Sequence, residues 1–270
     1  MEETGNSSGI FAEMEELAAA IERDPASMAG SWATWRGGSF DEVQVDYGSG
    51  MGDYVVALAA NNPKTLFVGV ERELFCIVKA ARKAIDAGLG NIAFSPSENR
   101  TLPELFAPGE LARICICFPT PYPHARDAEK RLTYLDSLLE YRELLARGGR
   151  LFLKTDSATL FDFTLTQLDL AGYRIDWRTS DLRCEMPEDP QTGYERRTVA
   201  RGAKILALEA EPIELAGEPV QTARLSLFDY LPEDLESLDY VPLDMERSVR
   251  NMIEARRRVE EGRRQREKRR

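Results

Sequence analysis

The chain has 270 residues, of which 43% are hydrophobic and 30% charged. It is long enough for one large α/β domain with tails or for two small domains, and it is too apolar to be disordered throughout. The formal net charge of −11 argues against a protein that coats nucleic acid or an anionic membrane with its whole surface. This charge is uneven, because residues 246–270 hold eleven Lys and Arg against five Glu and leave −17 for the rest of the chain.

The predicted elements begin with a helix over 10–23, followed by a Gly/Ser/Trp segment whose Trp32 and Trp35 are expected to pack onto a neighbouring domain. From residue 42 onward, short β-branched runs alternate with longer helical stretches, which is typical of a parallel sheet with crossover helices. The sequence therefore predicts a doubly wound α/β domain. The predicted strands lie at 43–47, 65–70, 91–94, 112–118, 150–154, 173–179 and 203–208. The predicted helices lie at 53–61, 73–87, 130–145 and 158–171.

Composition divides the chain into four parts. Residues 1–40 are a helical lead-in, and residues 41–210 hold the seven-stranded domain. Residues 211–245 are predicted to be an acidic linker, since 211–244 contain nine acidic residues, one basic residue and four prolines, with one short element at 225–230. Residues 246–270 have the spacing of a basic helical tail, which is either a solvated charged helix or an RNA-recruiting arm.

The cysteines and the N-terminal residues indicate a compartment. The four cysteines lie in or beside apolar stretches without the spacing of a disulfide framework, so we expect a reducing cytoplasm. The sequence shows neither a secretory leader nor an apolar run long enough to span a membrane, and no membrane partner is expected. With His124 as the single histidine, no metal site is expected either.

A glycine-rich loop follows the first predicted strand and opens the first helix of the domain. Its sequence is Asp46-Tyr47-Gly48-Ser49-Gly50-Met51-Gly52. Such glycines let the backbone turn tightly and approach a ligand, while the helix N-terminus offers unpaired N–H groups. The pattern alone is weak evidence, because a glycine-rich turn also serves packing.

An acidic residue after the second strand strengthens the prediction of a cofactor site. Glu71 lies about twenty residues beyond the loop, where a carboxylate can accept both hydroxyls of a ribose. The loop lacks the Gly-x-Gly-x-x-Gly spacing suited to a pyrophosphate, and Asp46 would repel phosphate and attract an ammonium group. These features favour S-adenosylmethionine over a dinucleotide. Glu98 and Asn99, after the third strand, either hydrogen-bond the adenine edge or cap the following turn.

Four ordered motifs carry a family resemblance. They are the glycine loop, the run Cys117-Phe118-Pro119-Thr120-Pro121-Tyr122-Pro123-His124-Ala125-Arg126 with Lys130-Arg131-Leu132, the strand end Lys154-Thr155-Asp156, and Thr192-Gly193-Tyr194-Glu195. Over residues 43–208 the chain resembles the bacterial tRNA (guanine-N7)-methyltransferases. The resemblance implies a Rossmann-like class I methyltransferase, with a seven-stranded mostly parallel sheet and helices on both faces. It also implies S-adenosylmethionine as cofactor and tRNA as partner. We expect a monomer or homodimer.

The chain departs from this family in one loop. The family sequence there is approximately Phe-Pro-Asp-Pro-Trp-Pro, followed by a strongly basic run. Thr120 stands where the family has its catalytic aspartate, and Tyr122 replaces the tryptophan. The basic run is thinned by Asp127 and Glu129, which opposes RNA affinity because added carboxylates offset the gain from releasing counterions.

The resemblance assigns further roles by position. Thr120 and Asp156 fall at catalytic positions, and Asp156 is expected to accept hydrogen bonds from N1–H and the N2 amine of the target guanine. Tyr122 either stacks on a base or closes its loop. The remaining residues expected on the substrate side are Arg126, Lys130, Arg131, Thr192, Tyr194 and Glu195. The alternatives without a functional role are a strand-end carboxylate for Asp156 and a surface turn for residues 192–195.

Several functions stay open at this point. Guanine N7 presents a lone pair and carries no proton, so methyl transfer to it needs no general base, and Thr120 does not by itself exclude catalysis. A diverged relative that only binds cofactor, RNA or a protein partner is the main alternative. A small-molecule methyltransferase is a third. An amine methyltransferase with an Asp/Asn-Pro-Pro-Tyr loop is disfavoured, because Thr120 separates the two prolines.

Overall fold

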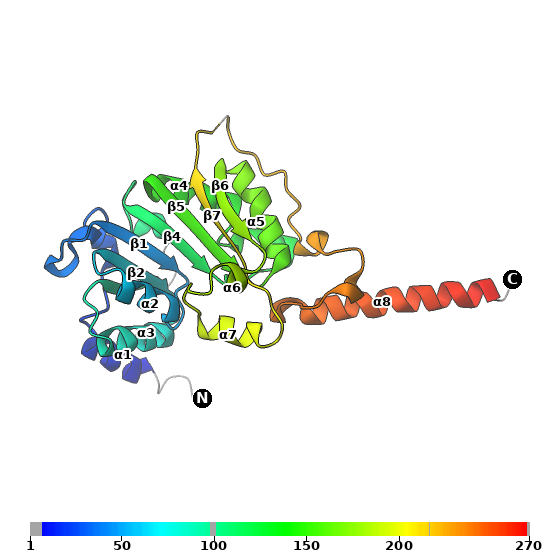
Figure 1. Ribbon diagram of the computed structural model, residues 1–270, viewed down its shortest axis with the longest axis horizontal. Helices are drawn as coiled ribbons and strands as arrows, with labels where there is room; N and C mark the ends of the chain where they lie inside the picture. The colour runs from blue at the N-terminus through cyan, green and yellow to red at the C-terminus, as the bar shows by residue number, and fades with distance from the viewer. Residues whose placement is uncertain (1–6, 98–100, 216, 269–270) are drawn as a thin grey trace.

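The computed structural model describes residues 7–97, 101–215 and 217–268, which form one α/β domain with a projecting C-terminal helix (Figure 1). The sheet has seven strands in the order β3-β2-β1-β4-β5-β7-β6. All neighbours are parallel except β7, which runs antiparallel to β5 and β6. The strands are β1 Glu42–Tyr47, β2 Thr65–Glu71, β3 Ile92–Pro96, β4 Leu111–Cys117, β5 Leu145–Thr155, β6 Tyr173–Thr179 and β7 Leu206–Pro212.

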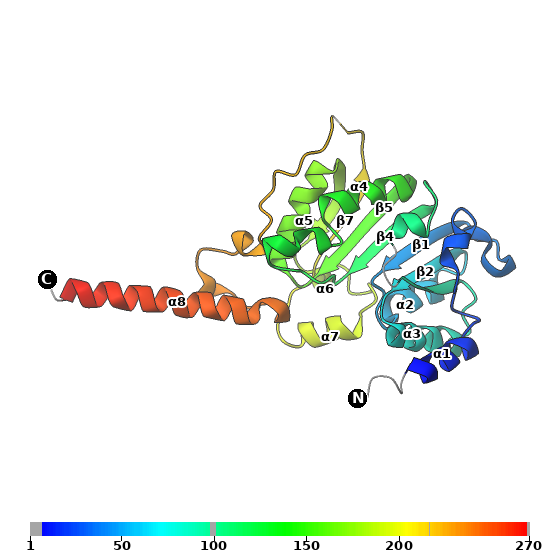
Figure 2. The same ribbon diagram turned by 180° about the vertical axis from the view of Figure 1, so that it is seen from behind.

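Helices cover both faces of this sheet (Figures 1 and 2). Buried strand residues alternate between the faces: Leu66, Val68 and Val70 of β2 pack into one core, whereas Phe67 packs into the other. This alternation is the period-2 pattern of a strand covered on both sides. The helices are α1 Ser7–Glu16, α2 Asp53–Asn61, α3 Leu74–Asp86, α4 Leu135–Leu144, α5 Ala158–Leu170, α6 Leu182–Glu185, α7 Gly193–Val199 and α8 Leu243–Lys268.

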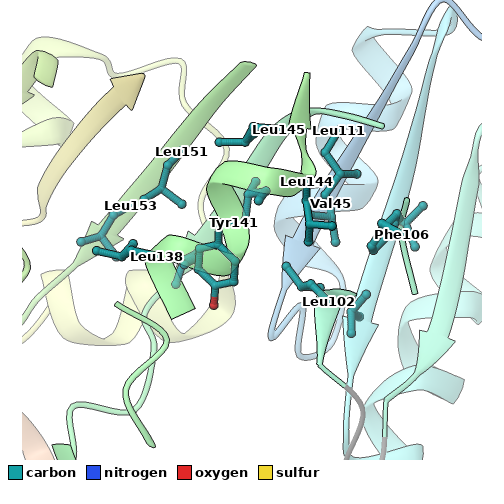
Figure 3. Packing of buried hydrophobic residues seen from close by; sticks show 14 of the residues in the cluster. Val45, Leu102, Phe106, Leu111, Leu138, Tyr141, Leu144, Leu145, Leu151 and Leu153 are labelled. Atoms are coloured by element: carbon teal, nitrogen blue, oxygen red, sulfur yellow. The ribbon is translucent and has the colours of Figure 1, made fainter. Parts of the chain in front are cut away.

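The two cores have different helical partners. Helices α1, α2 and α3 pack against β2 and β3 around Phe67 and Phe94. On the opposite face, α4 and α5 pack over β1, β4 and β5, where Tyr141 and Leu138 meet Leu151 and Leu153 (Figure 3). Because both faces are buried, the strands are fixed in register, and so are the loops at their carboxyl ends.

The fold predicted from the sequence is confirmed, with corrections at several boundaries. The helix expected at 10–23 ends at Glu16, because Ile21 instead forms a bridge with Phe94 beside β3. The helix expected at 130–145 is α4 alone, preceded by a 3₁₀ helix at Ala125–Lys130. The strand expected at 203–208 is β7, which begins three residues later because Ala203 N–H donates to Thr198 O and closes the turn after α7.

The N-terminal tryptophans attach the lead-in to the domain, as expected. Trp32 is fully buried, its Nε1 donates to the carbonyl of Leu105 at 2.8 Å, and its ring contacts Phe106. Trp35 Nε1 donates to Glu22 at 3.2 Å. Each buried indole thus has both an apolar contact and a hydrogen-bond acceptor.

The segment after β7 returns to the body before α8 begins. It holds 3₁₀ helices at Leu227–Tyr230 and Leu235–Ser237, where the sequence predicted one short element. Leu227 and Leu235 are buried. Helix α8 then extends away from the body (Figures 1 and 2). In the described part of the chain, no helix is both long and apolar enough to cross a membrane.

The strand order places a crevice beside β1 and β4. Crossovers from β1 lead to β2 and β3 on one side, and the chain then crosses to β4 on the other. In open α/β sheets, ligands bind outside the carboxyl ends of the strands at such a reversal point. The loops that follow β1 and β4 are the glycine loop and the Pro119–Pro123 region, so the topology brings the predicted cofactor and substrate segments together.

Candidate functional site

The glycine loop after β1 has the left-handed backbone that its sequence predicts. Gly48, Gly50 and Gly52 have φ of 81°, 52° and 75°. A Cβ on Gly52 would lie 2.6 Å from Cβ of Ala80, so this glycine permits close packing of α2 on α3. A Cβ on Gly48 or Gly50 would meet nothing within 4 Å. The loop is therefore packed on its inner side and open where a ligand would approach.

Glu71 lies against this loop. Its Oε2 accepts the N–H of Gly50 at 2.8 Å, and its Oε1 accepts the N–H groups of Arg72 and Glu73 at 2.7 and 3.0 Å. The three backbone donors hold the carboxylate at the end of β2. This is the position that recognition of a ribose requires.

Asp46 is a buried carboxyl beneath the glycine loop. It is 2% exposed, and among the described residues its Oδ1 has no hydrogen-bond partner; the hydroxyl of Ser49 lacks one too. Burial raises the pKa of Asp46 to about 7, against the opposing charge of Lys154. Unsatisfied buried polar atoms are costly, and two of them beside an open loop indicate a ligand-binding site.

Helix α7 closes this site from the opposite side. Asp53 at the start of α2 accepts the N–H of Gly193 at 2.8 Å, and Thr192 caps α7 by accepting the N–H of Glu195 at 2.9 Å. A cavity of about 260 Å³ remains between the glycine loop, Thr192, Tyr194 and Arg197. Neither α6 nor α7 was predicted, because both helices are short and their sequences lack a clear apolar stripe.

A buried ion-pair network fixes α7 to the end of β5. Lys154 is fully buried, and its Nζ lies 2.7 Å from Asp189 Oδ2, 2.9 Å from Glu195 Oε2 and 4.1 Å from the centre of the Tyr54 ring. Arg183 contacts the same two carboxylates, each at 2.8 Å. Two cations and two carboxylates balance, which is the condition under which buried charges are tolerated. Glu195, expected on the substrate side, instead points inward and positions α7.

The loop after β4 is held in a strained form. Phe118 and Tyr122 have positive φ of 54° and 45°, which is costly for bulky residues and is typical of functional sites. Arg131 is buried, and its guanidinium donates to the carbonyls of Pro121 at 3.0 Å and Tyr122 at 2.7 Å. Arg131 therefore shapes the loop rather than presenting its charge to RNA, and burial lowers the pKa of its guanidinium to about 10.

The other basic residues of this loop face solvent but share one carboxylate. Asp127 lies 2.7 Å from Lys130 Nζ and 3.4 Å from Arg126 Nε. Lys130 also lies over the Tyr122 ring, 5.9 Å from its centre. The intruding Asp127 thus offsets part of the positive charge that the loop offers, as the sequence indicated.

Asp156 directly follows β5, on the predicted substrate side of the crevice. Its Oδ2 accepts the hydroxyls of Tyr194 at 3.1 Å and of Tyr240 at 2.6 Å. A cavity of about 140 Å³ lies between Asp156, the exposed Thr120 and Pro242. The strand-end carboxylate is thus beside the proline loop that the sequence placed with it.

Three hollows meet at Phe118. This residue borders the cavity at the glycine loop, the cavity at Asp156, and a groove of about 700 Å³ that runs from Glu71 and Ser97 to Thr120 and Tyr122. The hollows on the predicted cofactor side and substrate side are therefore adjacent, with Phe118 in the wall of each.

Two predicted residues are not described by the structure, and three residues of the site were not predicted. Glu98 and Asn99, predicted near an adenine, fall outside the residues that the structure describes. Asp189, Arg183 and Tyr240 contribute to the site but were not predicted. Asp189 and Tyr240 act on partners far away in sequence, and Arg183 lies on the unpredicted helix α6. Within the described residues, no cluster of three or more His, Cys, Asp or Glu is arranged to hold a metal ion.

The strand order, the glycine loop after β1 and the carboxylate that ends β2 define a class I methyltransferase fold. Among solved structures, one described as an "antibiotic related Methyltransferase" has the same fold with a TM-score of 0.50 at 22% identity, covering 63% of this chain and 88% of that one. A family described as "Putative methyltransferase" matches residues 41–208.

Curated relatives make the family more specific. The tRNA (guanine-N(7)-)-methyltransferase of Exiguobacterium sibiricum is 30% identical over 198 residues, covering 73% of this chain and 92% of the relative. That of Brevibacillus brevis is 33% identical over 189 residues, covering 69% and 88%. The chain belongs to this methyltransferase family, as the motifs predicted.

The Lys154 network yields a stability prediction. Lys154→Met should lower the free energy of unfolding by about 3 kcal/mol or more, because Arg183 alone would then face two buried carboxylates. Urea denaturation measures this. Lys130→Met is the matched control: its side chain is 62% exposed, and its removal should leave the unfolding free energy near that of the parent protein. Equal midpoints for the two variants would contradict the assignment.

Proposed function

We propose that this chain transfers the methyl group of S-adenosylmethionine to N7 of a guanine in tRNA. The observation that carries the proposal is the junction at Phe118, where a cavity lined by the glycine loop meets a cavity lined by Asp156 and Thr120. A methyl donor on one side and a base on the other would face each other there. The names of the curated relatives support this choice of substrate.

The residues of the glycine-loop cavity fit the cofactor. Gly48 and Gly50 leave the loop open to a ligand, and Glu71 is placed for the ribose hydroxyls. Asp46 and Ser49 have unsatisfied polar atoms beside the loop, and an ionised Asp46 would attract the ammonium group of the methionine part. When bound, S-adenosylmethionine supplies an electrophilic methyl group on a sulfonium.

On the substrate side, the protein has to bind and align rather than deprotonate. Guanine N7 carries a lone pair and no proton, so proximity and orientation can supply most of the acceleration. Asp156 would accept hydrogen bonds from N1–H and the N2 amine. The hydroxyl of Thr120, in place of the family aspartate, would help to orient the base, and Tyr122 offers a ring for stacking.

The direct test is methylation of unmodified tRNA with methyl-labelled cofactor and excess enzyme. We expect N7-methylguanosine, with the rate reduced by about 100-fold in Asp156→Asn because a preorganised acceptor for the base is lost. Asp162→Asn is the control, since Asp162 is an exposed carboxylate on α5. Absence of N7-methylguanosine with the parent protein would contradict the proposal.

The variant Thr120→Asp distinguishes an active methyltransferase from a non-catalytic relative. The second possibility arises because Thr120 replaces the family aspartate. If the parent protein is active, restoring the aspartate should change the rate by less than about threefold, because N7 needs no general base. A gain from no activity to measurable activity would identify the natural chain as a cofactor-binding relative that has lost catalysis. Turnover of cofactor without RNA would indicate a small-molecule substrate.

Asp46 predicts a pH dependence of cofactor affinity. With its pKa raised to about 7 by burial, Asp46 is mostly neutral at pH 6 and mostly ionised at pH 7.5. Only the ionised form attracts the ammonium group, so the dissociation constant should fall by up to about eightfold over this range.

Calorimetric titration at the two pH values measures this change. Asp46→Asn should bind more weakly and lose the pH dependence, whereas Asp41→Asn, which alters an exposed carboxylate just before β1, should keep it. The same slope in Asp46→Asn as in the parent protein would assign the dependence to another group.

The projecting helix α8 is suited to recruiting tRNA. Met245 and Val249 anchor its first turns in the body, and Arg257 pairs with Glu236 of the preceding segment at 2.8 Å. Beyond this anchor the helix extends into solvent (Figure 2). Residues 255–270 hold nine Lys and Arg against three Glu, which suits a polyanionic partner.

Truncation after Glu254 keeps the buried contacts of Met245 and Val249 and removes Arg257 together with most of the positive charge. We expect weaker tRNA binding and a smaller slope of log affinity against log salt, because fewer counterions are released. Fluorescence anisotropy at salt concentrations from about 50 to about 200 mM measures both the affinity for tRNA and its dependence on salt. Cofactor affinity should be unchanged in the truncated protein, and an unaltered affinity and slope for tRNA would refute the recruiting role.

A further inference from the structure

The segment between β7 and α8 supplies a wall of the candidate active site. It lies beyond residues 41–208, which match the family described as "Putative methyltransferase". Even so, the hydroxyl of Tyr240 donates to Asp156 Oδ2 at 2.6 Å, and Pro242 lines the cavity shared by Asp156 and Thr120. Two residues from outside the matched region therefore contact the proposed guanine site.

This segment is anchored on both sides of Tyr240. Upstream, the N–H of Leu227 donates to the carbonyl of Pro123 in the loop after β4 at 3.0 Å. Downstream, Met245 is 1% exposed and accepts the hydroxyl of Thr159 on its sulfur at 3.3 Å. Since Thr159 lies on α5, the segment connects the proline loop to the helix that follows Asp156, and Tyr240 is held between these two contacts.

The hydrogen bonds to Asp156 leave acceptor capacity for a base. The hydroxyls of Tyr240 and Tyr194 both donate to Oδ2, whereas a carboxylate can accept about four hydrogen bonds on its two oxygens. Burial and the bond to Asp156 raise the pKa of Tyr240, so its hydroxyl stays a donor at neutral pH. The two tyrosines thus fix the orientation of the carboxylate and leave Oδ1 able to accept from a ligand.

The segment borders the cavity without filling it. About 140 Å³ remains between Pro242, Phe118 and Thr120 while Tyr240 is bonded to Asp156. A plug would occupy this space. A wall that leaves it open is the arrangement expected of a residue that orients the carboxylate for a substrate.

We propose that Tyr240 is a positioning residue for the target guanine, which aligns Asp156 through the hydrogen bond to Oδ2. The proposal rests on the function proposed above. The alignment of Asp156 matters because Thr120 replaces the family aspartate. With no aspartate in the proline loop, the carboxylate of Asp156 is the acidic group that lines this cavity. Its alignment therefore determines how the base is held.

Tyr240→Phe removes the hydroxyl and keeps the ring. We expect kcat for tRNA methylation to fall about tenfold or more, because a misaligned carboxylate misplaces the base. The KM for tRNA should stay within about twofold, since phosphate contacts elsewhere supply most of the affinity. Cofactor affinity and the midpoint of thermal unfolding should stay near those of the parent protein, which separates positioning from a folding defect.

Tyr230→Phe is the matched control, since its hydroxyl donates to the carbonyl of Arg224 in the same segment and does not reach Asp156. It should leave kcat and KM unchanged. Equal kcat in Tyr240→Phe and the parent protein, or a rise in KM alone, would overturn the positioning role, and a faster Tyr240→Phe would identify the segment as an inhibitory plug. An inactive parent protein would instead refute the proposed function.

Discussion

The buried charge of Lys154 is the constraint on which the arrangement of the site depends. A lysine with no exposed surface requires partners, and Asp189 and Glu195 supply them only if the chain between β6 and β7 folds back over the end of β5. That return places α7 opposite the glycine loop and Tyr194 beside Asp156. One buried ion-pair network therefore determines both the cavity at the glycine loop and one side of the cavity at Asp156.

Four segments form the site, and the sheet alone does not bring them together. They are the start of α2, helix α7, the proline loop after β4 and the segment between β7 and α8. Asp53 connects the start of α2 to α7, and Arg131 holds the carbonyls of the strained proline loop. The backbone bond from Leu227 to Pro123 then joins the C-terminal segment to this loop. Each connection is a hydrogen bond to a backbone group, which fixes the position of a loop without requiring a particular side chain at the partner.

The sequence predicted the sheet and its glycine loop because these depend on local patterns. Alternating apolar residues, the turn glycines and Glu71 at a fixed spacing act over short distances. The inward orientation of Glu195 and Arg131 was not predictable, because a motif shows which residue type is present and not which side of the backbone it faces. Tyr240 was missed for a related reason: its partner lies 84 residues away, and an isolated tyrosine in an acidic segment has no periodic signal.

The distribution of charge follows from the two ligands proposed for the site. Asp46 and Asp53 line the cavity proposed for a cationic cofactor, and Glu71 lines the adjacent groove. The same carboxylates would repel the phosphates of RNA. Positive charge near the proline loop is limited because Asp127 is shared by Arg126 and Lys130. Attraction of tRNA therefore has to come from a surface beyond the screening length of these carboxylates, on the order of 8 Å at physiological salt. Helix α8, which projects from the body on a buried anchor at Met245 and Val249, is such a surface. An acidic body is thus compatible with the proposed tRNA substrate, because the proposal assigns recruitment and chemistry to different parts of the chain.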